Sequence, residues 1–261
     1  MVKGPIQAAT VTAFPLDASM NRGTALANAP TMPDGTFTLS VPPYNGALEI
    51  VAFGGTYPEE AVGVPVQLTH ELSFVVPAFQ SGASVTATVS PISSIARSLA
   101  KAAIARGSSL SDAVTAAWTH VNNHFGGLDW RTIQPTSLTP SQPITVTMSD
   151  ATKAGLILAG ISQAARTMAE TSGLSPGTSV TGGTLSGAEA DDATDGTLDG
   201  MAFGTALVQG SAPLTSYTFR RVLGQAIVKF IGTPYNKTQQ TLGRSFACLM
   251  SYTGFQSDII M

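Results

Sequence analysis

Residues 34–42 read DGTFTLSVP, and this stretch decides how the N-terminal part of the chain folds. Phe37, Leu39 and Val41 alternate with Thr and Ser residues. A period of two places one row of side chains on a buried face and the other row in solvent. An Asp-Gly turn signal precedes the run, and a Pro-Pro-Tyr-Asn-Gly turn signal follows it. We therefore predict a half-buried β-strand over residues 36–41.

Other strand patterns surround this run. Residues 46–55 read GALEIVAFGG, and residues 48–53 are apolar except for Glu49, which is typical of a central strand. Similar runs occupy residues 2–17, 62–68, 72–76 and 84–89. Turn signals separate the runs about every ten residues, as they do in β-sandwiches. We predict an antiparallel β-sandwich over residues 1–89.

From residue 90 onward the apolar period changes to that of helices. Ser90, Ser109 and Ser149 are residues of the type that caps helix N-termini, and Pro91 suits a first helical position. The helices expected from these signals run from Ser90 to Gly107, from Ser109 to Gly126, from Ser149 to Gly173, over residues 214–232, and from Asn236 past Leu249. Residues 90–261 are therefore predicted to form a helical bundle. The predicted fold class is α+β, a sandwich followed by a bundle.

Three segments depart from the bundle pattern. Residues 143–148, PITVTM, alternate apolar residues with Thr and predict an isolated strand, which must pair with something. Residues 174–190 are rich in Gly, Ser and Thr and predict a loop. Residues 190–200, ADDATDGTLDG, predict an Asp-rich loop.

The N-terminal motifs resemble a known family. Residues 4–11, GPIQAATV, and the DGTFTLSVP run resemble the carboxypeptidase-regulatory-like domain, a transthyretin-like β-sandwich. Residues 43–61, PYNGALEIVAFGGTYPEEA, are similar to the N-termini of uncharacterised bacterial surface lipoproteins, in which such a sandwich precedes a helical region. The resemblance implies the fold and a place in the cell envelope or outside a bacterial cell. It implies no particular activity, because one fold hosts many functions.

The resemblance also implies a missing strand. The family's opening strand would lie upstream of Lys3, which leaves an open edge beside residues 4–14. Residues 143–148 or 258–261 could fill that gap from the same chain, or a neighbouring copy could donate the strand. A removed leader or lipid anchor is a further explanation, because the chain shows neither a signal peptide nor a cysteine near its start. Head-to-tail donation between copies would build a ring or a filament.

The composition limits the kinds of partner. Charged residues make up 11% of the chain, where soluble domains carry about 25%. The net charge is −3, so no basic surface for nucleic acid is expected. No run is long and apolar enough to predict a membrane span. Cys248 is the sole cysteine, so no intramolecular disulfide can form.

The Asp-rich loop is the candidate metal site. Asp191, Asp195 and Asp199 could supply oxygen ligands to calcium around Gly196. The EF-hand pattern is incomplete, because Ala202 stands where its last Glu belongs. The alternative is a turn whose Asp side chains bond the local backbone. No other cofactor is expected.

Two patterns suggest hydrolase chemistry. Ser98 and Lys101 match the S-x-x-K motif of serine acyl-enzymes, but the motif's usual companions are missing. His120 and His124 lie four residues apart on one helix, a spacing that suits zinc, but the Glu of the zinc-protease motif is absent. For both patterns the simpler interpretation is an ordinary helix face.

These observations favour a non-enzymatic structural protein of the cell envelope or extracellular space. It would act through protein partners or copies of itself, by β-strand complementation. The first alternative is a surface module that binds carbohydrate or peptide, with or without calcium. The second is a hydrolase.

Overall fold

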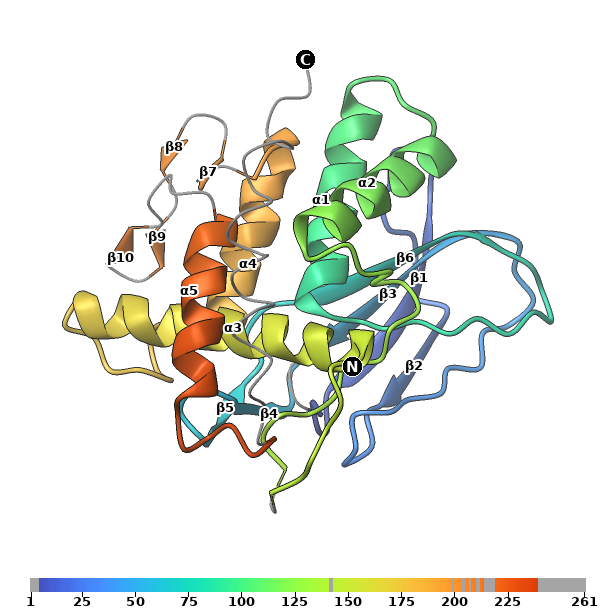
Figure 1. Cartoon of the computed structure of the whole chain (residues 1–261). Coiled ribbons are helices and arrows are strands. Elements are labelled where there is room, and N and C mark those ends of the chain that lie inside the picture. Colours follow the sequence, from blue (N-terminus) through green and yellow to red (C-terminus); the bar gives the residue numbers. More distant parts are fainter. Residues whose placement is uncertain are drawn as a thin grey trace.

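A computed structural model describes residues 5–140, 143–198, 200–202, 205–206, 208–209, 212–213 and 219–238. The chain forms antiparallel sheets in its N-terminal part and helices after them (Figure 1). The expected order of strands and then helices is therefore confirmed. No helix among the described residues is both long and apolar enough to cross a membrane.

A four-stranded sheet organises the N-terminal part. Its strands are β1 (Thr10–Leu16), β2 (Ala27–Pro30), β3 (Gly46–Phe53) and β6 (Leu72–Phe79), in the order β2-β1-β3-β6. Residues 47–52 of β3 are all buried, as expected of a central strand with both faces covered. A separate hairpin joins β4 (Thr56–Glu59) to β5 (Val64–Gln67).

The expectation of an open sheet edge beside residues 4–14 is wrong. β1 pairs with β2 on one side and with β3 on the other, so its own chain supplies both neighbours. The sequence did not indicate β2, because ANAP is short and lacks an apolar alternation. β2 is now an edge strand, and its short length and Pro30 discourage further pairing. At the other edge the Ser94 hydroxyl accepts the backbone N–H of Ser73 in β6 at 2.9 Å.

Two predicted strands are extended segments without strand partners. Residues 36–41 alternate between exposed and half-buried positions, and residues 83–89 are likewise irregular. They lie together at the right-hand side of Figure 1, in the blue and teal connections. The prediction that they are paired strands is therefore wrong, because they form no second sheet within the described part of the chain.

Three helices begin where their caps predicted. α1 (Pro91–Ala105) has a capping box between Ser90 and Ser93, and α2 (Leu110–His124) is capped by Ser109. α3 (Asp150–Thr171) is capped by Ser149. α5 (Phe219–Ile231) lies within the expected range 214–232. The helix expected after Asn236, the segment 258–261 and Cys248 lie outside the described residues, apart from residues 236–238.

α4 (Gly182–Asp192) corrects the predicted loop over 174–190. Its sequence, GGTLSGAEADD, has almost no apolar periodicity. Tertiary contacts hold its first turn: the Glu59 carboxylate accepts the N–H of Gly182 at 3.0 Å, and the Tyr57 hydroxyl accepts that of Gly183 at 3.1 Å. A carboxylate at a helix N-terminus also interacts favourably with the helix dipole.

The Asp-rich stretch is partly helical. α4 ends at Asp192, and a 3₁₀ turn, η1 (Ala193–Asp195), follows it. Two short strand pairs come next: β7 (Met201–Ala202) with β8 (Thr205–Ala206), and β9 (Val208–Gln209) with β10 (Ala212–Pro213).

Residues 143–148 do not form the predicted strand. They run as an irregular connection into α3, and the N–H of Ile144 donates to the carbonyl of Lys237 at 2.8 Å. Ile144 is 37% exposed. The alternation in PITVTM therefore marks a strand-like segment that joins none of the sheets formed by the described residues.

One hydrophobic core joins the sheet to the helices. It contains β3 residues such as Leu48 together with Ile95 of α1 and Ile157 of α3. α3 and α5 pack closely where Gly160 faces Ile227. The domain boundary at residues 89 and 90 stays a prediction.

Candidate functional site

The two faces of β3 lead to two different hollows. Neighbouring residues of a strand point to opposite faces, so Leu48 and Glu49 diverge. Leu48 lies in the floor of an uncharged groove, and Glu49 lies beneath a cleft lined by charged side chains. Each hollow is a candidate site.

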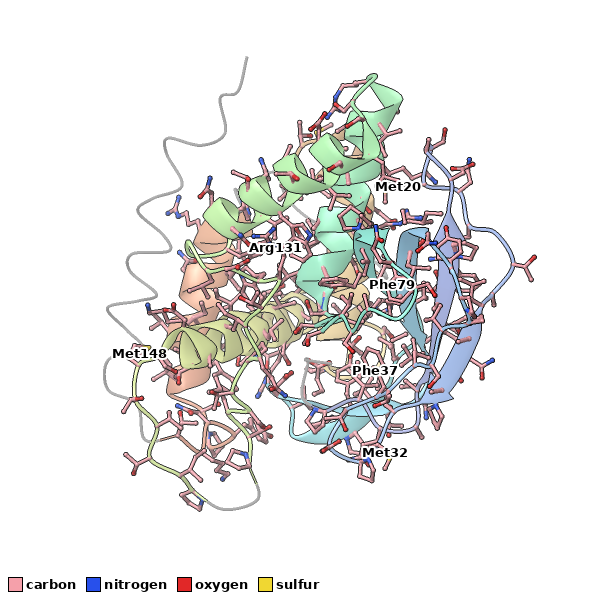
Figure 2. The ribbon with its side chains drawn as sticks, turned by 90° about the vertical axis from the view of Figure 1, so that its right-hand side faces the viewer. Met20, Met32, Phe37, Phe79, Arg131 and Met148 are labelled. Atoms are coloured by element: carbon pink, nitrogen blue, oxygen red, sulfur yellow. The ribbon has the colours of Figure 1, made fainter. Side chains whose placement is uncertain are left out.

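The uncharged groove is the larger hollow, with a volume of about 730 Å³. Its walls are residues 36–41 and 82–88, and its floor is an apolar part of the sheet. None of its lining residues carries a charge. The lining residues outside the two walls are Leu48, Ile50, Val76, Phe79, Thr132 and Gln134. Figure 2 shows Phe37 and Phe79 near this hollow.

Most of the backbone of the two groove walls has no hydrogen-bond partner among the described residues. Within the described parts of the chain, no hydrogen bond involves the main chain of residues 37–43 or 84–89. Backbone N–H and C=O groups in folded proteins are normally paired with protein or with water. Two extended segments that both face a gap with free donors and acceptors form a template for another strand.

The side chains of one wall already have a strand's alternation. Phe37, Leu39 and Val41 pack partly against the core, while Thr36, Thr38 and Ser40 are exposed. On the other wall Val85 is 49% exposed and Ala87 packs against the core. The walls therefore need only backbone partners to become regular strands.

The second hollow, the ionic cleft, lies on the other face of the sheet and has a volume of about 570 Å³. Its walls come from the β1–β2 and β5–β6 connections, α1 and α4. The polar side chains that line it are those of Asn21, Arg22, His70, Glu71, Ser73, Ser94, Arg97, Ser98, Lys101 and Asp191.

Glu49 anchors two of these arginines from below. Its side chain is fully buried, and it accepts Arg22 Nε at 2.8 Å, Arg22 Nη2 at 3.0 Å and Arg97 Nε at 3.0 Å. Burial alone would raise the pKa of Glu49, but the arginine hydrogen bonds and charges outweigh it and hold the pKa below 4.5. Arg22 also pairs with Glu71 at 2.7 Å. Burying a charge costs several kcal/mol, and the three hydrogen bonds from the two arginines offset that cost for Glu49.

The structure brings Ser98 and Lys101 to the same cleft. No hydrogen bond joins the two side chains in the described part of the chain. A serine nucleophile needs a base within hydrogen-bond reach, and Lys101 is an exposed side chain without that contact to Ser98. The geometry gives the hydrolase hypothesis a shared cleft but no activated nucleophile.

The histidine pair lies elsewhere, near the end of α2. The rings of His120 and His124 are stacked, with centroids 6.2 Å apart, and His124 is 4% exposed. His124 also packs edge-on against Phe125. Among the described residues, no group of three or more His, Cys, Asp or Glu side chains is placed to hold a metal ion.

The three candidate calcium ligands differ in what the structure shows of their surroundings. Asp195 accepts the N–H and hydroxyl of Thr197 at 3.0 and 2.6 Å, which is the local turn expected as the alternative. Asp191 faces the ionic cleft, and partial burial raises its pKa. Asp199 lies outside the described residues. Calcium binding by this stretch stays a prediction.

No protein-family model, curated protein or solved structure matches this chain. The candidate sites therefore rest on the geometry of this structure.

Reasoning from the sequence missed Arg22, Arg97 and the cleft that they line. One signal was present: Glu49 is the single charged residue in an otherwise apolar strand. A carboxylate in a central strand requires a cationic partner, because a buried unpaired charge is too costly. That signal predicts that arginines exist nearby without saying which ones.

Proposed function

We propose that the protein is a non-enzymatic structural protein of the cell envelope or extracellular space that assembles by β-strand complementation. The observation that carries the proposal is the uncharged groove, in which the main chains of residues 37–41 and 84–88 have no hydrogen bond within the described parts of the chain. A polypeptide strand is the ligand that can pair with both walls at once, because it offers donors and acceptors along both of its edges.

The chemistry of the groove supports an apolar strand as occupant. The floor contains Leu48, Ile50 and Val76, so alternate side chains of an incoming strand would be buried there. The exposed face of such a strand would lie among Thr and Ser residues. An incoming charged side chain would find no counter-ion among the lining residues.

Complementation would also complete the predicted sandwich. The inserted strand, flanked by residues 36–41 and 84–88, would form a three-stranded second sheet over the first one. This is the layered architecture of the transthyretin-like family that the sequence resembles. The proposal thus transfers the missing strand from the edge of β1, which β2 fills, to the uncharged groove.

The proposed occupant is residues 143–148 of a second copy. PITVTM has no charge, and Ile144, Val146 and Met148 alternate with Thr as the groove requires. Figure 2 shows Met148 and Phe37 apart from each other, and residues 143–148 do not line the groove of their own chain. Donation to a neighbour would replace the hydrogen bond between Ile144 and Lys237.

Donor and acceptor are different segments of the chain, so donation from one copy to the next is a head-to-tail contact. Such a contact is not self-complementary, so repetition closes into a ring or continues as a filament. The small number of charges on the chain supports association, because copies repel one another weakly.

The test uses one substitution in the acceptor and one in the donor. Val85→Asp places a charge at the wall of the groove, and Ile144→Asp places one in the donor segment. Both positions are exposed, at 49% and 37%, so the monomer should fold. Val64→Asp is the matched control, because Val64 is 42% exposed in β5 and does not line the groove.

Light scattering during size-exclusion chromatography gives the result. Wild type and Val64→Asp should assemble with rising concentration, and each of the other two variants alone should stay monomeric. An equimolar mixture of those two variants should form a 1:1 complex and grow no further, because each supplies the part that the other lacks. A wild type that stays monomeric at about 1 mM, where contacts as weak as about −4 kcal/mol register, overturns the proposal. Assembly that persists in both substituted variants would also refute it. So would a result in which the groove accepts a strand other than residues 143–148 and never accepts that segment.

A further inference from the structure

The ionic cleft carries an inference that is independent of assembly. We propose that the ionic cleft binds a small molecule through a carboxylate or phosphate group, with Arg97 and Lys101 as the residues that hold the oxyanion. The groove and the cleft lie on opposite faces of the sheet, so the two proposals stand or fall separately.

The position of Arg97 is fixed before any ligand arrives. Its Nε donates to the fully buried Glu49 at 3.0 Å, and its side chain is 21% exposed. Arg22 binds the same carboxylate through two nitrogens and so prevents Glu49 from turning away. A guanidinium that is oriented in advance loses little freedom when it binds.

Arg97 still has its strongest binding groups available. Among the described residues, the hydrogen bond from Arg97 to Glu49 uses Nε, and none uses Nη1 or Nη2. Those two nitrogens carry four of the five N–H donors of a guanidinium. Their spacing matches two oxygens of a carboxylate or a phosphate, which is the most favourable geometry for binding either group.

Further donors lie on the same helix face. Ser94, Arg97, Ser98 and Lys101 all line the cleft, and their spacing of three and four residues along α1 places them in one row. The Ser98 hydroxyl and the Lys101 ammonium have no hydrogen-bond partner within the described chain. An oxyanion held by Arg97 can therefore gain a second cation and a hydroxyl donor.

The charges in the cleft narrow the ligand class. Arg22 is already occupied by Glu49 and Glu71, so the cations that remain are the outer part of Arg97 and Lys101. Asp191 is the one carboxylate lining the cleft that has no such partner among the described residues, and it stands on the α4 wall. This wall disfavours a polyanion and favours a ligand with one oxyanion and an amino or hydroxyl group elsewhere.

The experiment measures anion binding to the intact chain at constant ionic strength. Inorganic phosphate, glycolate and glycine are titrated by isothermal calorimetry and by the NMR signal of the Arg97 Nε–H, with chloride as the reference. Phosphate reports the tetrahedral oxyanion. Glycolate and glycine report a carboxylate with a hydroxyl or an amino group. Saturable binding of at least one of them, with a shift of the Arg97 signal, is the expected result.

Two variants locate the binding. Arg97→Lys keeps a charge beside Glu49 but removes the paired nitrogens, and it should weaken binding about tenfold, which corresponds to one charge-assisted hydrogen bond. Lys101→Gln does not touch Glu49 and should also weaken binding. Arg131→Lys is the control, because Arg131 has the same Nε–carboxylate bond to Asp129, at 3.2 Å, but does not line the cleft. The proposal fails if none of the three probes saturates, or if Arg97→Lys and Lys101→Gln bind as the wild type does.

Discussion

Glu49→Gln tests the ion pairs beneath the ionic cleft. The substitution keeps the size and shape of the side chain and removes its charge. It converts three charge-assisted hydrogen bonds, from Arg22 Nε, Arg22 Nη2 and Arg97 Nε, into weaker or mismatched contacts. It also leaves Arg97 without its carboxylate partner and leaves Arg22 with Glu71 alone.

The magnitude follows from burial. Breaking a buried ion pair by removing one partner costs about 3–5 kcal/mol. The arginine side chains remain 27% and 21% exposed and can recover some hydration, so the lower end applies. We expect a loss of about 3 kcal/mol in the free energy of unfolding, or a fall of about 6–12 °C in Tm for a chain of this size.

Urea unfolding followed by circular dichroism measures this loss, with Glu71→Gln as the control. Glu71 bonds the same Arg22, at 2.7 Å, but is 47% exposed, so its removal should cost less than about 1 kcal/mol. Equal costs for the two substitutions would refute the reasoning, because they would show that burial of Glu49 contributes nothing.

The same pair predicts a dependence on pH. The pKa of Glu49 is lowered in the folded state, so its contribution is present above the unfolded value of 4.5. That contribution is lost as the pH falls from 4.5 through the folded pKa. The difference in free energy of unfolding between wild type and Glu49→Gln should therefore become smaller in acid. A difference that stayed constant with pH would contradict the lowered pKa of Glu49.

Two further substitutions test the helical part. A Cβ at Gly160 would lie 2.6 Å from Ile227 Cγ1, so Gly160→Leu should overpack the α3–α5 contact and cost about 1–3 kcal/mol by urea unfolding; an unchanged midpoint would show that these helices do not pack closely. Burial is the main cause, and the charge of Asp192 the second cause, of a pKa for Glu189 well above 4.5. The stability contributed by the protonated carboxyl is therefore fully present below pH 4.5 and is lost as the pH rises through the folded pKa. Glu189→Gln should therefore raise Tm in alkaline solution and change little in acid, whereas a lower alkaline Tm would argue against a buried carboxyl.

The sequence predicted those elements that depend on interactions between residues close together in the chain. Ser90, Ser109 and Ser149 marked the starts of three helices, because a cap bonds N–H groups only two or three residues away. α4 escaped prediction because Gly182 and Gly183 are held by Glu59 and Tyr57, more than a hundred residues earlier.

The candidate sites show the same division. The alternation of residues 36–41 was visible in the sequence and survives in the burial of Phe37 and Leu39. Whether those residues find a strand partner was not visible, because pairing depends on which segments the fold brings alongside. The spacing of Ser98 and Lys101 is visible in the sequence, whereas no local pattern marks the arginines that lie around them.

The sequence by itself determined the local elements of this protein: strands first, capped helices after them, and one carboxylate set in an apolar strand. Those features follow from side-chain period and from bonds within one turn of chain. Only the tertiary structure decided that β2 closes the edge of β1, that two strand-like segments face an uncharged groove, and that Glu49 meets Arg22 and Arg97. These ion pairs join residues 27 and 48 positions apart, and the energy of burying a charge selects them only once the chain has folded.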